Sequence, residues 1–216
     1  MLQNKVFIIG LPRTGTTSIC AAMLKLGFTV AHTAYTQTTF EKAQVIADTP
    51  AFADFIRLDD YYPNSKFIYL TRNTKKWLPS IKQLLQRMYV NVSRDDGGFN
   101  TIIKRCYQKT FSPFILENIE SDEFLTNSYM NHRNEVVQHF SQRPKDLLVI
   151  DISELESYRK LLTFLSLDDS NNKGAFEKLN VGGKVTAWKD LKHDNKIEST
   201  KNGRISLLDY LIVPEN

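Results

Sequence analysis

Between residues 10 and 17 the chain reads Gly10-Leu11-Pro12-Arg13-Thr14-Gly15-Thr16-Thr17. The apolar run Lys5–Ile9 precedes this loop, and apolar residues spaced at i, i+3, i+4 and i+7 follow it from Ile19 as far as Gly27. The first pattern is typical of a buried parallel strand, and the second predicts a helix that ends at a glycine. A glycine loop between a strand and a helix is the setting of a phosphate-binding loop, in which backbone N–H groups surround an anion.

The loop departs from the nucleotide-triphosphatase pattern at one position. That pattern, G-x4-G-K-[ST], has a lysine that reaches the β- and γ-phosphates, and this chain has Thr16 in its place. Arg13 still supplies a cation within the loop. The sequence therefore favours a ligand with a shorter anionic group over ATP or GTP. The residues expected to hold that group are Arg13, Thr14, Gly15, Thr16, Thr17 and Ser18.

Strands and helices alternate outward from the loop. Further strands are predicted at residues 28–31, 44–47, 66–71 and 147–150, and further helices at 50–62, 74–89 and 153–165. This alternation predicts an α/β fold with three layers and a central parallel sheet, of the P-loop nucleoside-triphosphate-hydrolase type. Residues 91–145 interrupt the alternation with helical, aromatic-rich sequence. We expect one domain over 1–216, with a helical insertion that either covers the ligand or packs its aromatic residues into a subcore.

A second motif follows the strand at 66–71 and reads Tyr69-Leu70-Thr71-Arg72-Asn73-Thr74-Lys75-Lys76-Trp77-Leu78-Pro79-Ser80. Arg72 lies at the carboxyl end of the strand, and Ser80 lies in the next helix, about 9 Å from its start. Both side chains can face a phosphate on the same side of the sheet as the glycine loop. Taken alone, each residue type is common on a protein surface.

Together the two motifs resemble the sulfotransferases that depend on 3′-phosphoadenosine 5′-phosphosulfate (PAPS). The resemblance implies that a loop of the type [K/R]-x-G-T-[TS] holds the 5′-phosphosulfate, and that Y-x-x-R-N-x-K-(x)4-S holds the 3′-phosphate. The first is matched by Arg13, Gly15, Thr16 and Thr17, and the second by Tyr69, Arg72, Asn73, Lys75 and Ser80. Residues 182–189 partly match the family's R-K-G-x-x-G-D-W-K segment, which makes Lys184 a candidate phosphate contact. Residues 176–183 resemble its F-P-x-x-N stretch, with Glu177 in place of proline.

The resemblance also implies a catalytic base. The cytosolic enzymes carry it as the histidine of K-T-H-L-P, and the corresponding residue here is Asp48, two residues before Pro50. Glu41 and His32 are the second and third candidates. Each has a plainer interpretation: Asp48 as a helix cap, Glu41 as a solvated helix charge, and His32 as a loop residue. A base would add about 10²–10⁴-fold to an in-line transfer, in which Arg13 stabilises the developing charge.

Two other functions remain open from the sequence. A P-loop kinase or nucleotide-phosphate hydrolase is suggested by Asp151, which follows the strand at 147–150 as a metal-holding aspartate would. Asp151 could equally cap the next helix. A non-catalytic nucleotide-binding relative is suggested by the lack of a histidine at position 48. Magnesium dependence would separate the kinase from a sulfotransferase, for which we expect no metal.

Bulk properties limit the partners. The chain has 216 residues and a net charge of +4, and its basic residues are spread along the sequence, which suits a small anionic ligand better than nucleic acid. No run approaches the roughly 18 apolar residues of a membrane span. The two cysteines are not spaced as metal ligands, and a cytoplasmic protein is expected. The acceptor, a small molecule or a glycan, and the oligomeric state are not readable from these patterns.

Overall fold

The structure is a computed structural model that describes residues 4–168, 174–177, 179 and 187–199. Five strands form one sheet in the order β2-β3-β1-β4-β5, and every neighbouring pair is parallel. The strands are β1 (Val6–Ile8), β2 (Val30–Ala31), β3 (Val45–Ala47), β4 (Lys66–Leu70) and β5 (Leu147–Ile150). The predicted α/β fold with a central parallel sheet is confirmed.

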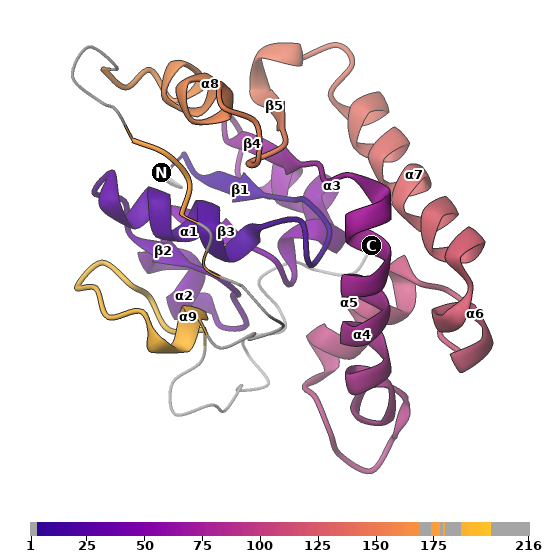
Figure 1. The fold of residues 1–216 in the computed structure, drawn as a ribbon. Coiled ribbons are helices and arrows are strands. Elements are labelled where there is room, and N and C mark those ends of the chain that lie inside the picture. Colours follow the sequence, from indigo (N-terminus) through magenta and orange to yellow (C-terminus); the bar gives the residue numbers. More distant parts are fainter. Residues whose placement is uncertain (1–3, 169–173, 178, 180–186, 200–216) are drawn as a thin grey trace.

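Helices cover both faces of the sheet (Figure 1). They are α1 (Thr16–Lys25), α2 (Gln37–Lys42), α3 (Ala51–Tyr61), α4 (Thr74–Ser93), α5 (Thr101–Thr110), α6 (Leu116–Glu120), α7 (Asp122–His139), the 3-10 helix η1 (Pro144–Asp146), α8 (Ser157–Phe164) and α9 (Ala187–Asp190). Strand β1 is apolar on both faces, so helices pack on both sides of the sheet and the fold has three layers. Val6 and Ile8 pack with side chains of α1 and α8, whereas Phe7 packs with those of α3 and α7. Within the described ranges, no helix has both the length and the apolar character to cross a membrane.

Two details differ from the sequence prediction. Helix α8 begins at Ser157 rather than at residue 153, because the Asp151 carboxylate accepts hydrogen bonds from the backbone N–H and the hydroxyl of Ser153, which form a turn there. Helix α2 lies between β2 and β3, where the apolar spacing had predicted no helix. It begins at Gln37 and is capped by Thr36, whose hydroxyl accepts the Thr39 N–H, and hydroxyl caps of this kind carry no apolar signal.

The chain between β4 and β5 folds into the helices α4–α7, which gather on one side of the molecule (Figure 1). Their inner faces form a second hydrophobic cluster that includes Trp77, Tyr107, Phe111 and Tyr129, all buried. Leu11 of the glycine loop belongs to the same cluster and is fully buried. The aromatic residues of this region therefore fill a subcore, and that subcore supports the loop from one side.

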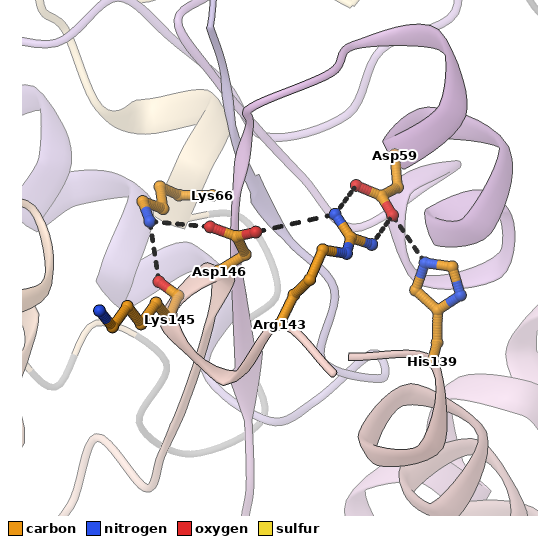
Figure 2. A network of polar contacts seen from close by, with 6 residues as sticks. All are labelled: Asp59, Lys66, His139, Arg143, Lys145 and Asp146. Atoms are coloured by element: carbon orange, nitrogen blue, oxygen red, sulfur yellow. Dashed lines mark hydrogen bonds and ion pairs between the residues drawn. The ribbon is translucent and has the colours of Figure 1, made fainter. Parts of the chain in front are cut away.

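A polar network closes the amino-terminal edge of the sheet, opposite the glycine loop (Figure 2). The carboxylate of Asp59, near the end of α3, accepts bonds from Arg143 and from His139 Nε2, the latter at 2.7 Å. Arg143 also lies 3.7 Å from Asp146, which pairs at 2.9 Å with Lys66 at the start of β4. Asp59 is buried, so the network joins α3, α7 and β4 around a carboxylate that water barely reaches.

Asp59→Asn is expected to lower the free energy of unfolding by about 1–3 kcal/mol at pH 7. Burial alone would raise the pKa of Asp59, but the bonds from Arg143 and His139 outweigh it and hold that pKa below its ordinary value. The ionised carboxylate therefore stabilises the fold above the pKa of the unfolded carboxyl, near 3.9, and this contribution is lost as the pH falls through the folded pKa. Urea unfolding should thus show wild type and variant converging below about pH 4.

A matched control is Asp96→Asn. Asp96 also pairs with an arginine, Arg94, at 2.8 Å, but its side chain is 80% exposed. Exposed ion pairs contribute little, so this variant should unfold like the wild type. If Asp59→Asn and Asp96→Asn lowered the free energy of unfolding equally, burial would not be the reason that the Asp59 network stabilises the fold.

Candidate active site at the carboxyl edge of the sheet

The parallel sheet brings residues from all five strands to one edge. The glycine loop follows β1, His32 follows β2 and Asp48 follows β3. Arg72 and Ile152 lie two residues beyond the ends of β4 and β5. In sheets of this type the carboxyl ends of the strands are where ligands bind. The residues that the sequence singled out at positions 13–17, 32, 48 and 72 therefore share one edge.

The loop backbone has the geometry of an anion nest. Arg13 and Gly15 have positive φ angles of 71° and 109°. A Cβ atom on Gly15 would lie 2.3 Å from Cδ1 of Ile152, and the φ of 109° strains a residue that has a Cβ, so glycine is favoured. The Gly15 carbonyl accepts the N–H groups of Ser18 and Ile19. In the described part of the chain, the N–H groups of Gly15 and Thr16 donate no hydrogen bond. Both residues lie at the amino-terminal end of helix α1, where free N–H groups and the helix dipole stabilise an anion.

Two of the predicted loop contacts are oriented differently. Thr14 is buried, and both its N–H and its hydroxyl donate to the Leu11 carbonyl, at 3.3 and 2.7 Å. Thr14 thus closes the loop on itself. Ser18 lines a cavity of about 330 Å³ beside Lys25 and Tyr158, next to α8 and away from α4. The sequence could not separate these two from Thr16 and Thr17, because all four fall within one turn of the loop and helix.

The two motifs meet directly. Arg13 Nε donates to Ser80 Oγ at 2.7 Å, across 67 residues of sequence, and Arg72 Nη1 donates to the Arg13 carbonyl at 2.6 Å. The Trp77 indole N–H donates to the Pro12 carbonyl at 2.9 Å. Trp77 lies within the second motif, between Arg72 and Ser80. Its polar contact fastens the loop to α4, and no local pattern signals such a contact.

The arginines of this edge form no ion pairs with the carboxylates that the structure describes. Burial, the positive charge of Arg87 and then that of Arg72 lower the pKa of the Arg13 guanidinium. Ion pairs to carboxylates are formed by Arg94, Arg105, Arg143 and Arg159. Within the described ranges, Arg13 and Arg72 form none. Half-buried cations that form no ion pair favour an anionic ligand between them.

Asp48 faces the loop and does not cap α3. Its carboxylate accepts from Thr16 Oγ1 at 3.3 Å and from Thr49 Oγ1 at 3.1 Å, whereas the first position of α3 has no side-chain cap. Asp48 is half-buried with a φ of 52°, a region that aspartate tolerates better than most residues. Burial and, to a lesser degree, the Asp48 charge raise the pKa of Tyr107.

His32 also reaches the loop. Its Nε2 lies 3.1 Å from Thr17 Oγ1, and its ring lies 5.4 Å from that of Trp188, at a tilt of 32°. Burial lowers the pKa of His32, while the Asp48 charge opposes this shift. The imidazole is therefore favoured in its neutral form, which can accept a proton. Asp48 and His32 thus hold the two adjacent threonines of the loop from neighbouring strands.

Glu41 is not part of this edge, and the prediction that placed it near the loop is wrong. It is exposed on α2 and accepts a bond from Gln37 Nε2 at 2.8 Å. Its charge acts on Lys5 and Tyr62, at the amino-terminal end of β1. The reason is the course of the chain: after β2, helix α2 leads back to the start of β3. Residues just before a parallel strand lie at the opposite edge from those just after it.

Three further residues from the sequence analysis are Lys75, Lys184 and Asp151. Lys75 is exposed at the start of α4, and Lys184 lies outside the described residues. Asp151, the basis of the kinase alternative, has its Oδ1 engaged by Ser153 at 2.9 and 2.7 Å. Among the residues that the structure describes, no group of three or more histidine, cysteine or acidic side chains could hold a metal ion.

Known proteins provide an independent comparison. A search of curated proteins found no match to the chain. The sequence profile of one protein family, described as "Sulfotransferase domain", matches residues 5–39 and 33–185. The matched segments together contain the glycine loop, Asp48 and the Arg72 motif, and they extend over most of the chain.

Proposed function

This chain belongs to the sulfotransferase domain family, and on that premise we propose that it transfers the sulfuryl group of PAPS to a hydroxyl or amine of a small-molecule or glycan acceptor. The carrying observation is the direct contact of the two motifs: Arg13 bonds Ser80, and Arg72 bonds the Arg13 carbonyl. Two cations next to an anion nest suit a ligand with two separate anionic groups. A cytoplasmic setting belongs to the proposal, and it suits the two free, buried cysteines, Cys20 and Cys106.

The residues present fit such a donor. The N–H groups of Gly15 and Thr16, with the Arg13 guanidinium, would hold the phosphosulfate end. Arg72 and Ser80 would hold the 3′-phosphate, Ser80 by releasing its bond to Arg13. PAPS supplies a sulfuryl group joined to a phosphate that is the leaving group. The part of the chain is to fix the geometry and to stabilise the negative charge that grows on the phosphate oxygen.

Asp48 is the proposed base. It would take the proton from the acceptor oxygen as that oxygen attacks sulfur, so that the phosphate leaves without needing that proton. The hydroxyl of Thr16 fixes one carboxylate oxygen, and the half-buried position keeps bulk water from surrounding the group. His32 is the second candidate, because it is favoured in its neutral form and lies on the adjacent strand end.

Calorimetry with 3′-phosphoadenosine 5′-phosphate (PAP), the desulfated product, tests the donor site without an acceptor. We expect PAP to bind in the micromolar range without magnesium, and Arg72→Ala to weaken it about 10- to 100-fold, since one charge-assisted contact is lost. 5′-AMP lacks the 3′-phosphate and serves as the matched control, with an affinity that Arg72→Ala leaves unchanged. Absence of PAP binding, together with magnesium-dependent ATP binding, would refute the sulfotransferase and favour the kinase.

A further inference from the structure

A third arginine, Arg87, joins Arg13 and Arg72 near the glycine loop. It lies on helix α4, on the face that meets that loop. Arg87 follows Ser80 by seven residues, which places the two about 20° apart around the helix axis and about 10.5 Å apart along it. Ser80 on this face is bonded to Arg13 Nε at 2.7 Å. Arg87 Nε donates to the Gln83 carbonyl at 3.3 Å, so its side chain is turned back along α4 in the direction of Ser80 and Arg13.

The Arg87 charge has no role in the fold that the contacts reveal. In the portion of the chain described, no carboxylate lies within ion-pair distance of Arg87, although Arg94, just after the end of α4, pairs with Asp96 at 2.8 Å. The positive charge of Arg87 lowers the pKa of Arg13, after burial and ahead of Arg72, so the like charges of Arg87 and Arg13 act on each other. Keeping like charges together costs free energy, and an anion between them offsets that cost.

The position of Arg87 also separates it from the proposed donor contacts. Arg13 and Arg72 are half-buried beside the loop, whereas Arg87 is exposed. The charges of Tyr107 and of Asp48, the proposed base, also act on the pKa of Arg13, and both raise it. Arg87 is therefore the most solvent-accessible of the three arginines, in a position open to a second ligand beside the donor.

We propose that Arg87 binds an anionic substituent of the acceptor, so that the enzyme prefers acceptors carrying a carboxylate, phosphate or sulfate group near the hydroxyl that receives the sulfuryl group. The proposal rests on the proposed function, because it places the acceptor beside the donor site. Arg87 would position the acceptor through a charge-assisted contact and would take no part in proton transfer.

Two probes of equal shape test this in the PAP-saturated protein: 4-hydroxybenzoate, which is anionic at neutral pH, and its neutral amide, 4-hydroxybenzamide. Calorimetry at constant low salt is expected to show at least about tenfold tighter binding of the carboxylate. The ratio of the two affinities, carboxylate over amide, should fall below about threefold in Arg87→Gln. Arg87→Lys should retain part of the preference for the carboxylate. PAP affinity should stay within about threefold of wild type in both variants.

Arg94→Gln is the matched control, since it removes the same charge from an arginine that lies seven residues further along the chain and already forms an ion pair. Its ratio should equal that of the wild type. A ratio that survives Arg87→Gln, or equal binding of the two probes by the wild type, including no binding of either, overturns the proposal. So does a tenfold loss of PAP affinity in Arg87→Gln with an unchanged ratio, which would assign Arg87 to the donor. Absence of PAP binding in the wild type refutes the proposed function, and the acceptor assignment falls with it.

Discussion

Asp48→Asn is expected to lower kcat by about 10²–10⁴-fold and to leave PAP affinity within about twofold. Asparagine keeps the size of the side chain and an oxygen that can accept the Thr16 hydroxyl, but it cannot take a proton. The structure places the carboxylate against the loop at 3.3 Å from Thr16 Oγ1, and the loop is where the sulfuryl group would be held. The measurement is the rate of PAP formation from PAPS with any acceptor that the wild-type protein uses.

Two further variants show whether the effect is specific to Asp48. Glu41→Gln changes a carboxylate in the same manner at the opposite edge of the sheet, so its kcat should equal that of the wild type. His32→Gln removes the second candidate base and should lower kcat much less than Asp48→Asn does. If the His32 variant lost the larger factor, the histidine would be the base and Asp48 a partner of the loop. Undiminished turnover in both would mean that no base of this kind is needed.

Arg13→Gln is expected to lower kcat by about 10²–10³-fold, because it removes a charged donor from the place where negative charge develops. Arg13 already has a side chain at its positive φ, so glutamine adds no backbone strain there. Thermal unfolding of the variant should therefore remain close to that of the wild type. Single-turnover kinetics with saturating PAPS would separate the chemical step from binding.

The comparison with Arg72→Ala makes the Arg13 prediction specific. Loss of Arg72 should appear mainly as weaker PAP binding, whereas loss of Arg13 should appear mainly in kcat. An Arg13→Gln variant with a raised KM for PAPS and an unchanged kcat would show that Arg13 binds the ground state and the transition state equally well. Arg13→Lys, which keeps the charge but not the planar fork, should recover part of the lost rate.

The glycine loop and its two flanking elements could be predicted from the sequence because their causes are local. Gly15 has a positive φ, the run from Val6 to Ile8 is apolar on both faces, and the apolar residues of α1 recur at helical spacing. The spacing of the second motif, from Tyr69 to Ser80, is likewise set within one strand and one helix. Such features depend on neighbouring residues in the chain, so they can be predicted without knowledge of the fold.

What joins distant segments was decided by the tertiary structure alone. Glu41 and Asp48 are only seven residues apart, yet the chain passes along β3 between them, and they lie at opposite edges of the sheet. Neither the contact of Arg13 with Ser80 nor that of Trp77 with Pro12 has a signature in its own stretch of sequence. The sequence by itself determined the type of fold and the residues able to bind an anion. Which of them meet was decided by strand order and helix packing, since a side chain's partners depend on where the chain returns and not on its neighbours in sequence.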